Sequence, residues 1–253
     1  MLIEARGLRK HFGGLNALDG IDLSVKEREV LGIIGPNGAG KTTLFDVLTG
    51  FAKPNGGQVS FAGQDITGMP ADRMPHLGIY RTFQRASVFR ELSVTENLII
   101  GSHVRIDTSL RDDLLRTAKF RSREQAAREK ADQVLAFLGI PQLASQLAGT
   151  LSYGNQKLLS LGVALMGEPK LLLLDEPAAG MNSTEINHLM SLVKQLRALL
   201  VTVIVVEHDM KFIMDICERI VVLDFGSVIA QGTPQEISHN ADVIRIYLGV
   251  KRC

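Results

Sequence analysis

The pattern of apolar and polar positions predicts a protein built from both strands and helices. Short apolar runs stand at 30–34, 171–174 and 201–206, and neither face of these runs is polar. Such runs are typical of parallel strands that helices cover on both sides. Residues 2–5 and 17–25 instead alternate between apolar and polar, which predicts half-buried strands. We therefore expect an α/β fold, with a mixed sheet and flanking helices, preceded by an N-terminal antiparallel β subdomain.

A helical pattern replaces the strand pattern over residues 93–165. A capping box at 93–96 opens a short helix. Ser122 and Gln125 are expected to cap a longer amphipathic helix that ends at Gly139. The apolar stripe of that helix consists of Ala127, Ala131, Val134, Leu135 and Leu138. This stretch predicts an inserted helical subdomain.

The chain is thus expected to have three parts. Residues 1–92 form the first part of the core, and residues 93–165 form the helical subdomain. Residues 166–253 complete the core, with a hairpin at 220–230 followed by two short helices.

A glycine-rich segment follows the first buried strand and precedes a helix-like stretch. Its residues are Gly35, Pro36, Asn37, Gly38, Ala39, Gly40, Lys41, Thr42 and Thr43. They match the phosphate-binding loop G-x-x-x-x-G-K-T, in the strand-loop-helix context that the motif requires. The glycines Gly35, Gly38 and Gly40 permit positive φ angles, which turn backbone N–H groups toward a phosphate. Lys41 would contact the β- and γ-phosphates, and the Thr42 hydroxyl would bind Mg²⁺.

The alternative interpretation of this segment is a plain glycine-rich turn between a strand and a helix. The lysine and the threonine stand in register with the glycines, which favours the phosphate-binding loop. The chain is therefore expected to bind a nucleoside triphosphate.

Three polar residues follow buried strands and are expected at one edge of the sheet. Asp175 and Glu176 come directly after four leucines, and His208 follows the run 201–206. Ligands of open α/β sheets bind at this carboxyl edge. Asp175 can hold Mg²⁺ through its waters, while Glu176 points the other way and can polarise an attacking water. His208 can contact a γ-phosphate, although by itself it is also consistent with an ordinary strand-end histidine.

Three further residues carry weaker signals. Phe12 is expected on a flexible glycine turn at 10–14, where it either stacks on an adenine or plugs the N-terminal sheet. Ser152 is positioned as the N-cap of a helix that runs to about Gly167, so this helix start is a second anion-binding position. Gln84 ends a predicted strand and has no function that the residue alone indicates. A basic stretch at 103–123 faces either anionic lipid or a partner, or is a solvated surface.

Composition narrows the class of protein. The chain has 253 residues, of which 45% are hydrophobic, and a formal net charge of +1. That charge balance argues against a nucleic-acid-coating protein. No apolar run reaches the roughly 20 residues of a membrane span, and the start of the chain resembles no secretory signal. The chain is expected to be soluble and cytoplasmic, with Cys217 and Cys253 as incidental thiols.

Taken in order, these motifs resemble the ATP-binding cassette of an ABC transporter, which has a P-loop NTPase core. The ordered set consists of the loop 35–43, Gln84, the signature 151–156, the acidic strand end 175–176 and His208. The resemblance covers essentially the whole chain. It implies an ATPase that uses ATP and Mg²⁺. It also implies a role for four residues. Phe12 would stack on the adenine, and Gln84 would be a Mg²⁺ and water ligand that senses the transmembrane partner. Glu176 would be the general base, and His208 would be the γ-phosphate switch.

In this family the signature acts on the nucleotide of a second subunit. The resemblance implies that Ser152, Tyr153, Gly154 and Asn155 complete the ATP site of the partner in a head-to-tail dimer. The partner is expected to be a second copy or a paralogous cassette. Several positions depart from the general family pattern, namely Tyr153, Asn155 and Asn182. More unusual are Leu158 and Val163, which stand where arginine is common. These departures leave open how well the signature helix is tied to neighbouring acids.

A finer resemblance is to the ATPase of branched-chain and hydrophobic amino acid importers. It rests on the sequence segments 78–84, 175–182 and 243–249 and on the helical insert near 101–123. It implies two transmembrane permease subunits, an indirect periplasmic solute-binding partner, and a peripheral position on the cytoplasmic side of the inner membrane. The permease is expected to dock in the groove between the core and the helical insert, near Gln84 to Asn97, where Val88, Phe89 and Leu92 are expected to be exposed apolar side chains.

Several alternatives share part of this pattern. The ATPases of urea and short-chain amide importers share many of these sequence motifs, as does the lipopolysaccharide export ATPase. A soluble cassette ATPase acting on DNA or ribosomes is the competing class, but the chain has no heptad run and a near-neutral charge, so no nucleic-acid partner is expected. A catalytically idle cassette is a third possibility, and Glu176 argues against it.

Overall fold

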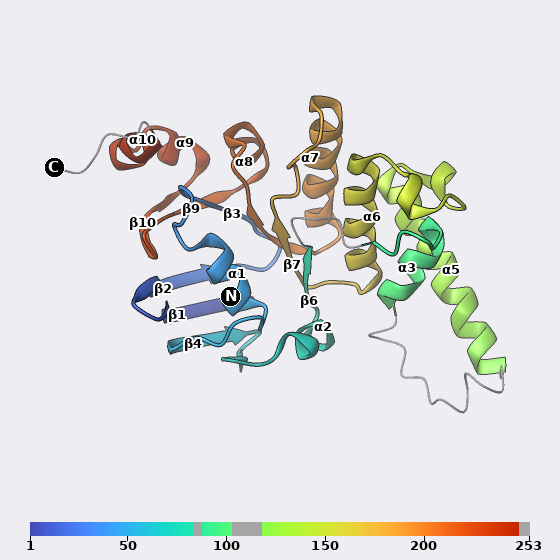
Figure 1. Ribbon diagram of the computed structural model, residues 1–253, viewed down its shortest axis with the longest axis horizontal. Coiled ribbons are helices and arrows are strands. Elements are labelled where there is room, and N and C mark those ends of the chain that lie inside the picture. Colours follow the sequence, from blue (N-terminus) through green and yellow to red (C-terminus); the bar gives the residue numbers. More distant parts are fainter. Residues whose placement is uncertain (83–87, 103–117, 248–253) are drawn as a thin grey trace.

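The computed structural model describes residues 1–82, 88–102 and 118–247 (Figure 1). Gln84 and most of the basic stretch 103–123 lie outside the described residues. The strands are β1 Ile3–Phe12, β2 Leu15–Val25, β3 Val30–Ile34, β4 Gly56–Phe61, β5 Gln64–Asp65, β6 Ile79–Thr82, β7 Leu171–Asp175, β8 Thr202–Val206, β9 Arg219–Asp224 and β10 Ser227–Gly232. The α-helices are α1 Lys41–Leu48, α2 Met74–Leu77, α3 Val94–Ser102, α5 Ala118–Leu138, α6 Tyr153–Met166, α7 Ser183–Ala198, α8 Met210–Ile216, α9 Pro234–Ser238 and α10 Ala241–Tyr247.

The strands form two sheets. A four-stranded sheet with the order β2-β1-β4-β5 is antiparallel throughout. A six-stranded sheet with the order β10-β9-β3-β8-β7-β6 is parallel except for β10, which pairs antiparallel with β9. The mixed sheet and the N-terminal antiparallel sheet expected from the sequence are therefore both confirmed.

The central strands of the larger sheet are buried on both faces. Leu171 and Leu173 of β7 face one hydrophobic cluster, which also contains the antiparallel sheet and α1. Leu172 and Leu174 face a second cluster, which includes residues of α3, α5, α6, α7 and α8. Because successive side chains of a strand point to opposite faces, four consecutive leucines supply both cores. The apolar runs are thus explained by helices or a second sheet on each side.

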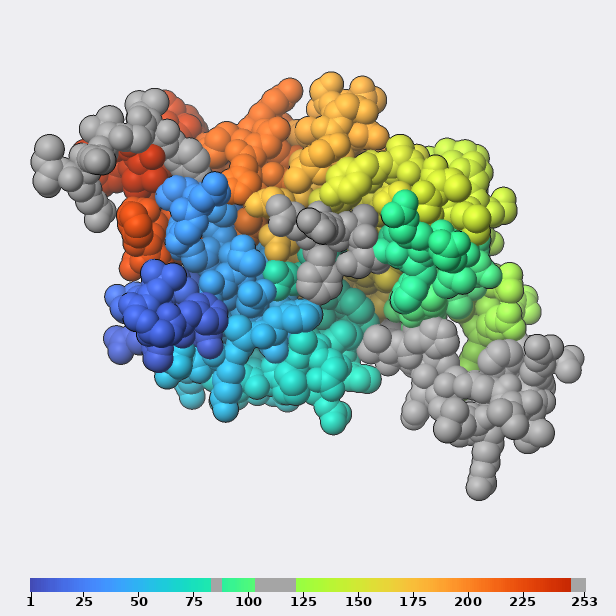
Figure 2. Space-filling model, in the orientation of Figure 1, coloured from blue at the N-terminus to red at the C-terminus, as the bar shows by residue number. Residues whose placement is uncertain are grey.

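The helical part lies at one end of the molecule and the antiparallel sheet at the other, as Figure 2 shows in green to yellow and in blue. Helices α3, α5 and α6 contact one another there. The predicted apolar stripe of α5 is buried at every position: Ala127, Ala131, Val134, Leu135 and Leu138. The capping box of α3 is also present, because Ser93 and Glu96 exchange hydrogen bonds of 2.7 and 3.2 Å.

Two local predictions were wrong. Ser122 does not cap α5, because the helix already begins at Ala118 and no glycine or proline separates the two residues. Phe12 does not lie on a flexible turn, because β1 continues to Phe12 and pairs it with Leu15 of β2. Helix α5 thus starts before its expected cap, and β1 runs up to the glycines 13–14.

The carboxyl ends of β3, β7 and β8 meet at one edge of the larger sheet. The register of the parallel pairs places Asp175 beside Val206 and Ile33 beside Val206. The glycine-rich loop leaves β3 at this edge, as do Glu176 after β7 and His208 after β8. Three segments far apart in the sequence are therefore brought together by strand order alone.

Candidate nucleotide-binding site

The glycines of the loop 35–43 adopt the conformations that the motif requires. Gly35, Gly38 and Gly40 have φ angles of +153°, +81° and +102°. A Cβ at Gly35 would lie 2.2 Å from the carbonyl oxygen of Leu223, and a Cβ at Gly40 would lie 2.5 Å from that of Ala17. Both positions therefore require glycine for space as well as for φ. The expected positive φ angles are confirmed.

The lysine of the loop is held by the loop itself. Lys41 is 7% exposed, and its Nζ donates hydrogen bonds to the carbonyl oxygens of Gly35 (2.7 Å) and Pro36 (2.9 Å). Burial lowers the pKa of Lys41, whereas the negative charges of Glu176 and Asp175 act to raise it. The ammonium group thus lies between the loop backbone and two carboxylates.

A cavity of about 290 Å³ opens over this loop. It brings together Phe12, Glu176 and His208 with most of the loop, from Asn37 to Thr43. The side chains that complete its lining are Leu15, Asn16, Ala17 and Phe225. An aromatic ring, backbone N–H groups at a helix start, a carboxylate and an imidazole therefore surround one space. These are the groups that bind a nucleotide and its phosphates.

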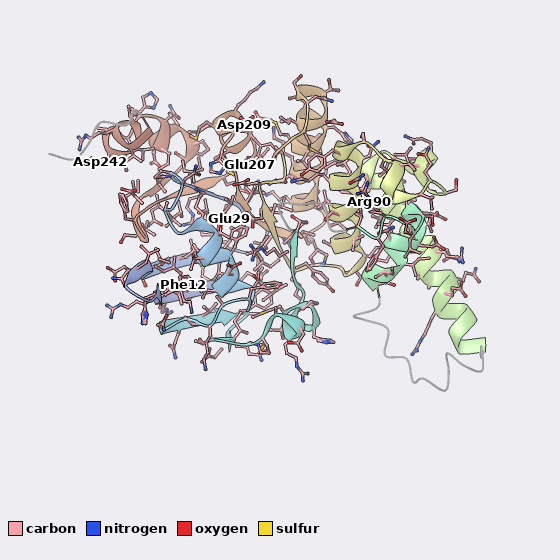
Figure 3. All side chains as sticks on the ribbon, in the orientation of Figure 1. Phe12, Glu29, Arg90, Glu207, Asp209 and Asp242 are labelled. Carbon is pink, nitrogen blue, oxygen red and sulfur yellow. The ribbon has the colours of Figure 1, made fainter. Side chains whose placement is uncertain are left out.

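Two aromatic side chains stand at the mouth of the cavity. Phe12 is 53% exposed and lies under the ammonium of Lys10, 4.9 Å from the ring centre; Figure 3 shows it on the antiparallel sheet. Phe225 is 83% exposed and has a φ of +42° in the turn between β9 and β10. Sequence reasoning overlooked Phe225, although an aromatic residue followed by glycine in a hairpin turn was a usable signal.

The two candidate catalytic side chains are in contact. His208 Nε2 lies 2.7 Å from Oε1 of Glu176. Glu176 has a φ of +46°, and its N–H donates to the carbonyl oxygen of Val206 across the two strand ends. A non-glycine residue with this φ requires support from its surroundings. The structure therefore fixes Glu176 in an unusual conformation beside His208.

Asp175 lies deeper than Glu176 and has a partner that sequence reasoning missed. Its Oδ2 accepts a hydrogen bond of 2.8 Å from Nη2 of Arg81, whose Nη1 donates to Oδ1 of Asp46 at 2.6 Å. The guanidinium group also lies 5.6 Å from the ring centres of Phe45 and Phe51. The side chain of Arg81 is 6% exposed and ties β6 to both β7 and α1. No local pattern around Arg81 indicated this role.

The signature residues lie apart from this cavity. Ser152 is the N-cap of α6, as expected, and its Oγ accepts from the N–H of Asn155 at 3.3 Å. Gly154 packs against α7, because a Cβ there would lie 2.2 Å from Oε1 of Glu185. Tyr153 remains 43% exposed. Ser152, Tyr153, Gly154 and Asn155 are absent from the lining of the cavity over the loop 35–43.

The residue that ties the signature helix to the acidic strand end is Lys157. Its Nζ donates a hydrogen bond of 2.9 Å to the carbonyl oxygen of Glu176. Leu158 is buried in the core, and Val163 packs against it. The two missing arginines therefore do not leave α6 unattached, because the neighbouring lysine provides the link.

The fold and this loop define the class of protein. The chain belongs to the ABC transporter family, whose model matches residues 18–179. It is similar to a nucleotide-free ATP-binding cassette of an ABC transporter, with a TM-score of 0.85 and 34% identity over 97% of this chain and 98% of that one. The chain is thus an ATP-binding subunit of the class of ATPases whose activity is coupled to transport.

Within this class, the comparisons indicate one branch. A model described as branched-chain amino acid ATP-binding cassette transporter matches residues 227–252. The high-affinity branched-chain amino acid transport ATP-binding protein BraF of Pseudomonas aeruginosa is 43% identical, over 98% of each chain. The corresponding protein LivG of Salmonella typhimurium is 42% identical, also over 98% of each chain. The resemblance drawn from the motifs is confirmed.

Among the helices that the structure describes, none has the length and apolar character needed to cross a membrane.

Proposed function

We propose that this chain hydrolyses ATP to drive an importer of branched-chain or other hydrophobic amino acids. The contact between Glu176 and His208 over the phosphate-binding loop carries the proposal of hydrolysis. The similar proteins from Pseudomonas aeruginosa and Salmonella typhimurium, both named for high-affinity branched-chain amino acid transport, support the substrate class. They favour it over a urea or amide importer, a lipopolysaccharide exporter and a soluble cassette ATPase.

Different side chains around the cavity act on different parts of ATP. Phe12 stacks on the adenine, and the N–H groups of the loop 38–43 hold the phosphates at the start of α1. Lys41 exchanges its backbone acceptors for phosphate oxygens. Glu176 accepts a proton from the attacking water, and His208 donates a hydrogen bond to the γ-phosphate.

The donors near the phosphates fit Mg²⁺. Thr42 lines the cavity, and Asp175 ends β7 at the same sheet edge, so a hydroxyl and a carboxylate would be hard oxygen ligands for the ion. Gln84 would be a further oxygen ligand. When bound with ATP, the ion neutralises charge on the β- and γ-phosphates.

The signature residues act on the ATP of a second cassette. Ser152, Tyr153, Gly154 and Asn155 start a helix whose first N–H groups can bind an anion, yet they do not line the cavity of their own chain. A head-to-tail dimer, with a second copy or a paralogue, brings them to the partner's γ-phosphate. Loss of that phosphate on hydrolysis then opens the dimer.

A surface beside α3 is suited to the membrane partner. Of the three apolar side chains expected to be exposed here, Phe89 is 57% exposed, whereas Val88 and Leu92 are half-buried. Arg90, labelled in Figure 3, lies on the same segment. A short helix of a permease subunit would bury these apolar side chains. Two transmembrane subunits would be bound in this way in the importer. The chain would then act at the cytoplasmic side of the inner membrane, with a periplasmic solute-binding protein as an indirect partner.

One experiment tests hydrolysis and transport together. Cells that lack this chain are complemented with the wild type or with Glu176→Gln, and uptake of radiolabelled leucine is measured beside phosphate release by the purified complex. Both activities should fall by about 10²-fold or more in the variant. If Glu176→Gln does not reduce hydrolysis, the assignment of Glu176 as the general base is wrong. Hydrolysis without leucine, isoleucine or valine uptake would refute the substrate class alone.

A further inference from the structure

A buried carboxylate lies next to the site and has no part in the mechanism above. Glu207 is 4% exposed and stands between the last residue of β8 and His208. Figure 3 shows it in the middle of the molecule, beside Asp209. Carboxylates are rarely this buried unless several donors surround them, so the partners of Glu207 indicate what it does.

The partners of Glu207 come from two different loops. Oε1 accepts a hydrogen bond of 2.6 Å from the N–H of Ala178, in the loop after β7. Oε2 accepts one of 2.9 Å from the N–H of His208, in the loop after β8. One carboxylate thus joins the segment that follows Glu176 to the segment that carries His208.

Charges near Glu207 also link it to the signature helix. Burial raises the pKa of Glu207, whereas the N–H groups of Ala178, His208 and Asp209 act to lower it. The negative charge of Glu207 in turn acts on Lys157 of α6, whose Nζ is bonded to the carbonyl oxygen of Glu176. The carboxylate therefore interacts with all three segments that meet at the catalytic position.

The contact between Glu176 and His208 depends on such anchoring. The side chain of His208 is 47% exposed, so packing alone does not hold the imidazole at 2.7 Å from Glu176. The backbone of Glu176 is fixed from both sides, because its N–H is bonded to Val206 and its carbonyl oxygen accepts from Lys157 and Ala179. Glu207 supplies the matching anchor for the backbone of His208.

We propose that Glu207 is a positioning residue that locks the loops after β7 and β8 together and so holds His208 against Glu176. The inference rests on the proposed ATPase site. Glu207 itself is not among the residues that line the cavity over the loop 35–43. Its loss should impair the turnover step and leave the phosphate-binding loop, and hence ATP affinity, intact.

The test compares Glu207→Gln with Glu29→Gln in the full chain. The control changes another buried carboxylate in the same way, but Glu29 pairs with Arg219 at the opposite end of β3. In Glu207→Gln an amide nitrogen replaces one acceptor, so one of the two backbone N–H groups loses its bond. We expect kcat for ATP to fall about tenfold, with KM changed less than about twofold, and the control to match the wild type.

Amide hydrogen exchange measured by mass spectrometry gives a readout that does not need activity. Exchange over 177–181 and 207–210 should be faster in Glu207→Gln than in the wild type and in Glu29→Gln. Unchanged exchange in these segments, or an unchanged kcat, would overturn the proposal. If Glu207→Gln does not fold, the same measurements are made on Glu207→Asp, with the same expectations. Aspartate keeps the charge but is too short to bridge both loops. A wild type without ATPase activity would refute the proposed function, while exchange would still decide the role of Glu207.

Discussion

Nη2 of Arg81 lies 2.8 Å from Oδ2 of Asp175, and this ion pair is buried where the strand end meets the phosphate-binding loop. The carboxylate that we assign to the magnesium side of the site is therefore oriented by a cation from the neighbouring strand β6. A second carboxylate, Asp46, shares that cation from α1.

Replacing Arg81 by alanine is expected to lower the free energy of unfolding by about 3 kcal/mol, because two carboxylates lose a buried partner. Urea denaturation measures this change. The matched control is Arg128→Ala, which breaks an exposed ion pair with Glu124 on α5 and should cost less than about 0.5 kcal/mol. Equal effects of the two changes would show that the Arg81 network does not stabilise the fold.

The aromatic side chains at the mouth of the cavity give a second prediction. Phe12→Ala and Phe225→Ala should each weaken ATP binding, by about 1 kcal/mol or fivefold in Kd, because each removes a ring next to the nucleotide position. Titration with a fluorescent ATP analogue measures Kd. Phe89→Ala removes a ring about as exposed as that of Phe12 but away from the cavity, and should leave Kd unchanged. If only Phe12→Ala has an effect, Phe225 is not part of the site.

The raised pKa of Glu207 predicts a pH dependence of stability. A carboxyl group whose pKa is higher in the folded than in the unfolded chain binds its proton more tightly when folded. The contribution of this group to the free energy of unfolding is fully present below its pKa in the unfolded chain, about 4.3. It is lost as the pH rises through its pKa in the folded chain. The unfolding free energy of the wild type should therefore fall relative to Glu207→Gln over this interval. Urea denaturation at a series of pH values would contradict this if the difference between the two proteins stayed constant.

A fourth prediction concerns the strand that feeds the loop. A Cβ at Gly32 would lie 2.9 Å from Sγ of Cys217 and 3.2 Å from Cγ2 of Ile213. Gly32→Ala should therefore destabilise the fold by about 1–3 kcal/mol through overpacking. Cys217→Ala removes the nearest atom and should recover part of that loss, with a coupling energy above about 0.5 kcal/mol in a double-mutant cycle. Strictly additive effects would show that strand and helix separate easily at this point.

The sequence predicted those parts of the site whose geometry is local or follows from parallel strands. The glycine conformations of the loop 35–43 come from spacing within a few residues, and the common edge of Glu176 and His208 comes from the order of buried runs. Arg81 and Asp175 are 94 residues apart, and no periodic pattern connects them. Glu207 could not be recognised either, because only the structure shows that it is buried and which N–H groups surround it.

The errors of sequence reasoning have a common physical origin. Ser122 has the residue type of an N-cap, and Phe12 adjoins two glycines, so both carry real end signals. Helix α5 nevertheless begins before Ser122, at Ala118, and strand β1 includes Phe12, because both elements gain hydrogen bonds by extending that far. Local preferences of this kind amount to about 1 kcal/mol each and are outweighed by strand pairing and packing.

Lys41 illustrates how an enzyme that must cycle avoids holding its substrate too firmly. Its ammonium already has two acceptors in the carbonyl oxygens of Gly35 and Pro36. In the proposed mechanism an arriving phosphate would displace these bonds, so the contribution of Lys41 to ATP affinity would be the difference between two sets of acceptors. After the γ-phosphate leaves, the same carbonyls would accept the ammonium again. The loop that captures the substrate would thereby assist release of the products.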